Sequence, residues 1–75
     1  IINPGATVDH DCRLADGVHV SPGAHLAGSV RTGHCCWIGI GAAVRQQIVI
    51  GDDAIVGAGA TVVADVAAST PLVRP

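Results

Sequence analysis

Aliphatic side chains recur at every sixth position along almost the whole chain. One column of such positions is aliphatic at every member except Thr32, which is still β-branched. Its members are Ile2, Val8, Leu14, Val20, Leu26, Thr32, Ile38, Val44, Ile50, Val56 and Val62. A second column, which begins at Ala6 and ends at Val66, holds only small or aliphatic residues. The hydrophobic pattern therefore repeats every six residues, without an insertion, from Ile2 to about Ala67.

Turn-forming residues fill the third and fourth places of many of these units. Examples are Pro4-Gly5, Asp16-Gly17, Pro22-Gly23 and Asp52-Asp53, all pairs that favour tight turns. A helix would show a period of 3.6 residues and a simple strand a period of 2. A period of six with a turn in each unit instead predicts short strands joined by turns and wound into an all-β solenoid.

The composition excludes several classes of protein. The 75 residues carry a net charge of -2, only 13% charged residues, and Trp37 as the one aromatic side chain. A nucleic-acid binder would need a basic face, and a disordered tail would be more charged and less aliphatic. No apolar run approaches the length of about 20 residues that a membrane-spanning helix needs. We therefore expect neither a nucleic-acid partner nor membrane insertion.

The cysteines and the chain ends bear on location and completeness. Cys12, Cys35 and Cys36 are odd in number and two are adjacent, so they define no disulfide framework and favour a reduced, cytoplasmic protein. The chain opens inside the repeat without a Met. We expect a β-solenoid domain over 1–67 and a C-terminal tail over 68–75, both cut from a larger protein.

Two local motifs carry a resemblance to a known family. The run Asp9-His10-Asp11-Cys12 is followed by His19-Val20-Ser21-Pro22-Gly23. Together with the hexads, this order resembles the hexapeptide-repeat acetyltransferases, within them the sialic-acid O-acetyltransferase family, and above all its bacterial members that N-acetylate a UDP-4-amino-sugar. The resemblance extends from Ile2 to Val66, and the element in which two acids flank a histidine before a cysteine is specific within the fold.

The resemblance implies the fold in more detail. It implies a left-handed parallel β-helix with coils of 18 residues, so that this chain holds about 3.7 coils, each about 4.8 Å above the last. The general rule for parallel crossovers would have favoured the right hand. Stacking then places Gly28 over His10, Trp37 over His19, and Arg31 over Arg13. The resemblance also implies a homotrimer with its sites between subunits.

The resemblance implies acetyl transfer from acetyl-coenzyme A, used as co-substrate and without a metal. The acceptor would be an amino or hydroxyl group of a nucleotide-activated or sialic-acid-like sugar. By this resemblance His10 is the general base of a direct attack on the thioester, and Asp11 is its supporting acid. The family usually has the longer Glu at this place, and Asp9 is an alternative partner for His10.

The binding residues also come from the resemblance. Contacts to acetyl-coenzyme A carry over to His19, Gly28, Ile40 and Ala58, and Asn3 falls near the acceptor sugar. Ala58 stands where close relatives often have Gly. In the family, the usual C-terminal ending helps to close the coenzyme site. The stretch from Ala67 to Pro75 departs from that ending.

The residues themselves support this chemistry. A protonated amine cannot attack a thioester, and histidine is the side chain suited to accept a proton near neutral pH. A backbone N–H at Gly28 would stabilise the negative charge on the thioester oxygen. No step needs a covalent enzyme intermediate, so the cysteines are not required as nucleophiles.

Two other functions remain as alternatives. Some hexapeptide proteins are zinc-dependent carbonic anhydrases whose three His ligands include a close pair, whereas the four histidines here lie 9, 6 and 9 residues apart. A metal assay would detect such a site. The second alternative is a non-catalytic module that forms trimers or binds coenzyme without turnover.

Overall fold

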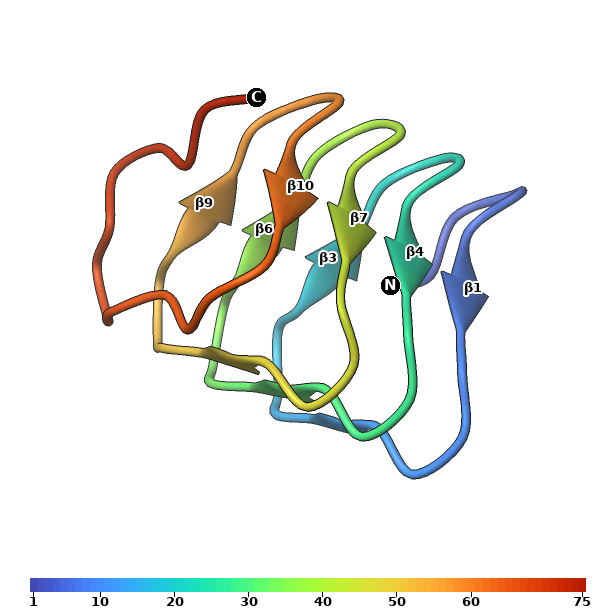
Figure 1. The fold of residues 1–75 in the computed structure, drawn as a ribbon, viewed down its shortest axis with the longest axis horizontal. Coiled ribbons are helices and arrows are strands. Elements are labelled where there is room, and N and C mark those ends of the chain that lie inside the picture. The colour runs from blue at the N-terminus through green and yellow to red at the C-terminus, as the bar shows by residue number, and fades with distance from the viewer.

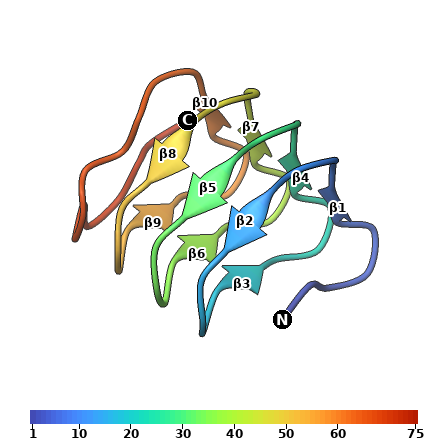
Figure 2. The same cartoon turned by 90° about the horizontal axis from the view of Figure 1, so that it is seen from below.

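The computed structural model describes residues 1–75 and contains ten short strands and no helix. The strands are β1 (Thr7–Val8), β2 (Arg13–Leu14), β3 (His19–Val20), β4 (His25–Leu26), β5 (Arg31–Thr32), β6 (Trp37–Ile38), β7 (Ala43–Val44), β8 (Val49–Ile50), β9 (Ile55–Val56) and β10 (Thr61–Val62). Each strand from β1 to β7 pairs in parallel with the strand three places further on (Figures 1 and 2). The predicted left-handed β-helix is confirmed. No helix that could cross a membrane is present.

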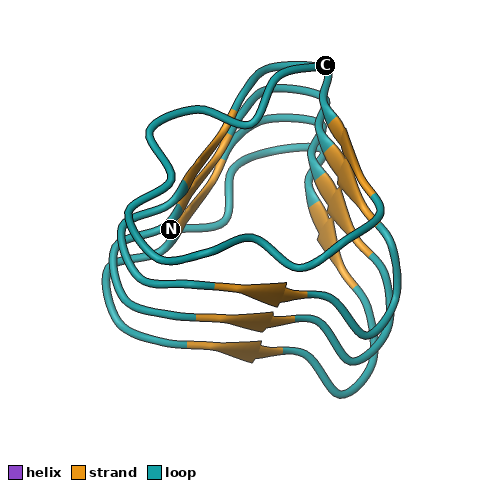
Figure 3. Ribbon diagram, turned by 60° about the vertical axis from the view of Figure 1, so that its left-hand side comes forward, coloured by secondary structure: helices purple, strands orange, loops and turns teal.

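Three flat sheets enclose the core as the faces of a triangular prism (Figure 3). We call them the β1 sheet (β1, β4, β7, β10), the β2 sheet (β2, β5, β8) and the β3 sheet (β3, β6, β9). The first corner, between the β3 and β1 sheets, comprises residues 3–6, 21–24, 39–42 and 57–60. The second corner, between the β1 and β2 sheets, comprises residues 9–12, 27–30 and 45–48. The third corner comprises residues 15–18, 33–36 and 51–54.

The predicted 18-residue register holds along these sheets. Arg13 pairs with Arg31, and His19 pairs with Trp37, which in turn pairs with Ile55. Because successive side chains of a strand point to opposite faces, the residue before each inward aliphatic points to solvent. The residue number alone therefore determines on which face of the prism and in which coil a side chain lies.

The corners are tight turns with one left-handed residue each. The fourth place of every hexad from Gly5 to Gly59 has a positive φ, between 58° and 75°. At the first corner the Ala6 N–H donates to the Asn3 carbonyl over 3.1 Å, which closes a four-residue turn around Pro4 and Gly5. This is the type II pattern, in which Pro suits the second residue and Gly the third. The turn formers of the sequence lie where their backbone preferences require.

The first column of aliphatic residues fills the interior, as predicted. Val20, Ile38, Ile50 and Val56 are completely buried, and the second column packs beside them through small residues such as Ala24. The prism has no room for an aromatic ring, and Trp37 lies outside, 49% exposed. The narrow core explains why a chain poor in large side chains can fold.

The register changes after the last strand. Val66 pairs with Ile50 and Val73 pairs with Val56, whereas the 18-residue register would place Ala68 and Arg74 there. The sequence pattern counted Val66 in the second column, so that assignment was wrong. The Asp65 carboxylate accepts a hydrogen bond of 2.9 Å from the Val49 N–H, in place of the carbonyl that the equivalent Arg31 N–H uses on Ile48. Residues beyond 67 thus still pair with the coil below.

Thr32 provides a test of the core. It is the one polar member of the inward column, 7% exposed, and its Oγ1 has no hydrogen-bond partner. Since an unsatisfied buried hydroxyl costs free energy, Thr32→Val should raise the free energy of unfolding by about 1 kcal/mol. Urea denaturation at a fixed protein concentration measures this. An unchanged or lower urea midpoint for Thr32→Val would contradict the conclusion that the Thr32 hydroxyl is buried without a partner.

Candidate functional site

His10 lies at the second corner, between two carboxylates with different tasks. Its Nδ1 lies 3.2 Å from Oδ2 of Asp11, and its backbone N–H donates to Oδ1 of Asp9 over 2.8 Å. The sequence left open which acid partners the imidazole; here Asp11 contacts the ring and Asp9 holds the backbone. Asp11 has a φ of 59°, so the left-handed turn residue is the one whose carboxylate reaches back to the ring.

This arrangement directs the imidazole chemistry to one nitrogen. A carboxylate that accepts the proton of Nδ1 fixes the tautomer in which Nε2 carries the lone pair. The side chains of His10 and Asp11 are 72% and 82% exposed, so the pair is open to a substrate. An exposed pair of this kind adds little to stability. Its consequence is orientation of the ring.

Gly28 lies directly above the His10 ring, as the register predicted. A Cβ atom added at Gly28 would lie 2.6 Å from Cε1 and 2.7 Å from Nε2 of His10. No side chain larger than hydrogen fits there unless the imidazole moves. The absence of a side chain at this one residue therefore allows the basic nitrogen to rest against the backbone of the next coil.

The N–H of Gly28 has no acceptor within the protein. The neighbouring Ser29 N–H donates to the His10 carbonyl over 2.9 Å, and the Gly28 carbonyl accepts from Gln47 over 3.0 Å, but no hydrogen bond uses the Gly28 N–H. The free N–H follows from the turn, since the second residue of a type II turn does not donate within it. A basic nitrogen and a free donor thus lie side by side at this corner.

A groove of about 400 Å³ runs along the β3 sheet and the first corner. Three of the residues expected to contact acetyl-coenzyme A, His19, Ile40 and Ala58, line it together. The rest of its wall is largely apolar, with contributions from Trp37, Ile55 and Leu72 among others. Ile40 is 63% exposed. The structure therefore brings these three predicted residues to one open surface.

His19 is held in place from two directions. Its ring stacks on Trp37, with centroids 3.9 Å apart and planes within 2°. The Asn3 amide nitrogen lies 2.8 Å from His19 Nε2 and also donates to the Val20 carbonyl over 3.0 Å. Nε2 thus accepts, which places the proton on Nδ1. Asn3, expected near the acceptor sugar, and His19, expected at the coenzyme, are in direct contact.

The predicted residues form two groups on one chain. Gly28 joins His10 and Asp11 at the second corner, whereas His19, Ile40 and Ala58 line the groove at the first corner. Equivalent positions of adjacent corners lie six residues apart along the chain, a reach of up to about 20 Å. Sequence reasoning missed Leu72 in the groove, because the tail has no repeat to place it. It also missed Ile55, which the stack above Trp37 could have revealed.

Two of the three cysteines pack into the structure, whereas Cys35 is exposed. Cys36 is buried in the second column, and its Sγ donates to the Gly51 carbonyl over 3.0 Å. Burial raises the pKa of the Cys36 thiol, which keeps it protonated and unreactive near neutral pH. Cys12 is half-buried and donates to the Ala27 carbonyl. No group of three or more His, Cys, Asp or Glu side chains gathers in a geometry that could hold a metal ion.

Comparison with known proteins agrees with this architecture. Residues 29–64 match the family model described as bacterial transferase hexapeptide (six repeats). The chain superposes with a TM-score of 0.88 on a histidine-to-asparagine mutant of perosamine N-acetyltransferase from Caulobacter crescentus, in complex with CoA and GDP-perosamine, at 48% sequence identity. That match covers 89% of this chain and 32% of the other.

The second similar structure is the acetyltransferase domain of PglB from Neisseria gonorrhoeae. It is 52% identical with a TM-score of 0.85, over 87% of this chain and 32% of the other. The chain thus spans about a third of the length of the structures that it matches. From the repeat, the fold and these matches, the chain has the hexapeptide-repeat, left-handed β-helix fold of the acetyltransferase structures that it matches.

Proposed function

We propose that the intact protein transfers an acetyl group from acetyl-coenzyme A to an amino or hydroxyl group of a nucleotide-activated sugar. The observation that carries the proposal is the contact between His10, supported by Asp11, and the backbone of Gly28. The identities of 48% and 52% to two acetyltransferase structures, one with CoA and GDP-perosamine, support the substrate classes. A cytoplasmic location accompanies the proposal, because acetyl-coenzyme A is available there.

The geometry supports a direct transfer. In this mechanism His10 Nε2 accepts the proton of the attacking amine or hydroxyl as the nucleophile bonds to the thioester carbon. The oxygen that becomes negative in the tetrahedral intermediate accepts a hydrogen bond from the Gly28 N–H. Asp11 stabilises the imidazolium that forms. Collapse of the intermediate breaks the carbon–sulfur bond, and the leaving thiolate of coenzyme A takes the proton from the His10 imidazolium, which restores the neutral base.

We further propose that a homotrimer completes the site. On one chain the His10 corner and the groove lined by His19, Ile40 and Ala58 lie at opposite edges of the β1 sheet. In a ring around a three-fold axis, two different patches meet at every contact, so the corner of one copy can face the groove of the next. The groove would hold the coenzyme and the neighbouring corner would hold the base.

The base assignment is tested by His10→Ala in the intact protein. Loss of a general base should lower kcat for acetyl transfer about 10²- to 10⁴-fold. His34→Ala is the matched control, because His34 occupies the same place of its hexad at the third corner and is exposed. Steady-state kinetics with nucleotide sugars measure both. Near-wild-type turnover by His10→Ala on every acceptor that the wild-type protein uses would refute the assignment.

The contact with Gly28 is tested by Gly28→Ala. The added methyl group would displace the His10 ring while leaving the N–H in place, so kcat should fall about 10- to 100-fold, as a shift of about 1 Å can cost. The same change in a His10→Ala background should have little further effect, because no base remains to be displaced. Equal losses in both backgrounds would show that Gly28 acts independently of His10.

Mixed assemblies test whether the site is shared. Ala58→Trp should block the groove and His10→Ala removes the base, so each variant alone should be inactive. In trimers co-expressed at equal levels, about a quarter of the sites would combine an intact corner with an intact groove from the next copy. Activity near that fraction of wild type is expected. Activity no higher than that of the two single variants would place the whole site on one chain.

A further inference from the structure

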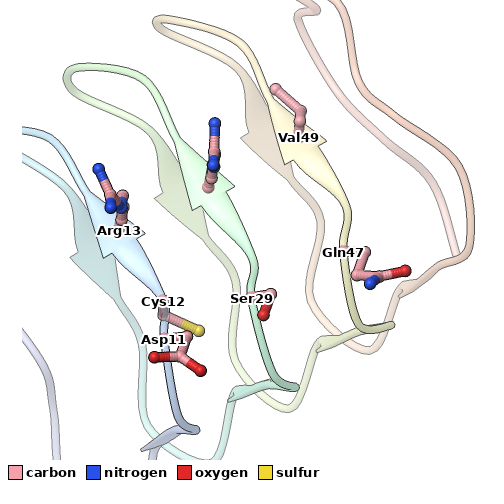
Figure 4. A pocket seen from close by; sticks show the side chains of 7 residues that line it. Asp11, Cys12, Arg13, Ser29, Gln47 and Val49 are labelled. Atoms are coloured by element: carbon pink, nitrogen blue, oxygen red, sulfur yellow. The ribbon is translucent and has the colours of Figure 1, made fainter.

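Besides the apolar groove, the protein has a polar hollow, which lies on the β2 sheet. It has a volume of about 750 Å³ and is lined by Asp11, Cys12, Arg13, Ser29, Arg31, Gln47 and Val49. These residues come from three successive coils, and Figure 4 shows the side chains of Arg13, Ser29 and Gln47 along them. Nothing in the acetyl-transfer mechanism above uses the two arginines.

Arg13 and Arg31 are stacked in direct register. Their Cα atoms are partners in the parallel pairing of β2 and β5, where adjacent strands lie about 4.8 Å apart. Like charges directly opposite one another in a sheet repel. Because Leu14 and Thr32 point into the core, both guanidinium groups extend to the outside of the same face.

No group of the chain neutralises these two charges. The one contact of salt-bridge geometry on the chain joins His10 and Asp11, and neither guanidinium takes part in a salt bridge or a side-chain hydrogen bond. Asp11 lines the same hollow, but its carboxylate contacts the His10 ring. Two adjacent, exposed and unpaired arginines form a site suited to an anion, since the guanidinium fork matches the oxygen atoms of phosphate.

The other residues of the hollow fit the same ligand. Ser29 and Gln47 occupy the left-handed turn positions of successive coils at the second corner, with φ of 60° and 61°. Their hydroxyl and amide groups can donate hydrogen bonds to phosphate oxygens. The hollow borders the His10 corner through Asp11, so a ligand held there by a phosphate can extend to the proposed base.

We propose that Arg13 and Arg31, with Ser29 and Gln47, bind the phosphate groups of a substrate in the acetyl-transfer reaction. This inference rests on the proposed function, in which two substrates carry phosphate: coenzyme A, with a diphosphate and a 3′-phosphate, and the nucleotide-activated sugar, with a diphosphate. The arginines supply two charge-assisted contacts on one face, and their mutual repulsion is relieved when the anion binds.

The test compares Arg13→Gln, Arg31→Gln and the double variant of the intact protein by isothermal titration calorimetry. The probes are coenzyme A, 3′-dephospho-coenzyme A, pantetheine and UDP. Each substitution should weaken binding of the phosphate-bearing ligand about 10-fold, the size expected for a charge-assisted hydrogen bond. Pantetheine, which has no phosphate, should bind equally to all variants. Arg74→Gln is the charge-matched control, because Arg74 lies outside the hollow, and it should match the wild type.

The probes distinguish the two sources of phosphate. Weaker binding of coenzyme A alone assigns the site to the coenzyme, and the dephospho form then tells whether the 3′-phosphate or the diphosphate is bound. Weaker binding of UDP alone assigns it to the sugar nucleotide. Affinities within 2-fold of wild type for every probe, in variants that unfold at the wild-type temperature, would overturn the proposal.

The outcome also separates this inference from the proposed function. Arginine-dependent binding by a protein that transfers no acetyl group would support the phosphate site and refute the enzyme. Acetyl transfer with unchanged KM values for both substrates in the double arginine variant would support the enzyme and refute the phosphate site.

Discussion

The hydrogen-bond ladder between successive coils is the constraint on which the rest of the structure depends. The Thr7 N–H donates to Ala24 over 2.9 Å, the His25 N–H donates to Ala42 over 2.8 Å, and the same connection repeats around the prism. Backbone groups in a small protein must find partners, and here they find them in the coil above or below. This ladder stacks residues that are 18 apart in the sequence directly over one another. Functional groups distant in the sequence therefore become neighbours in adjacent coils.

The corners impose the second requirement. Each hexad must accept one left-handed residue, and the turn must bring the backbone of one coil close to the next. At the second corner this closeness has a chemical consequence, because the imidazole of His10 lies against the backbone at Gly28. The same feature that closes the coil thus leaves a free N–H beside a basic nitrogen. The turn geometry that closes each coil therefore also forms the candidate site.

Much of this was predictable because the repeat is strict. The period of six identified the solenoid and the inward column, and the 18-residue coil that the family resemblance implied placed Gly28 over His10 and Trp37 over His19. Three features were not predictable. The register shift at Val66 depends on the Asp65 carboxylate substituting for a backbone carbonyl. The division of work between Asp9 and Asp11 and the place of Leu72 in the groove depend on side-chain contacts and on a tail without a repeat.

The most direct test of the account is a crystal structure of the intact protein with coenzyme A and a nucleotide sugar. The account predicts a trimer in which the coenzyme lies against His19, Ile40 and Ala58 of one copy. The thiol group should lie near His10 Nε2 and the Gly28 N–H of the next copy, with the acceptor within about 3.5 Å of Nε2. A coenzyme bound on a different face, or a thiol group remote from His10 in every copy, would contradict the central claim.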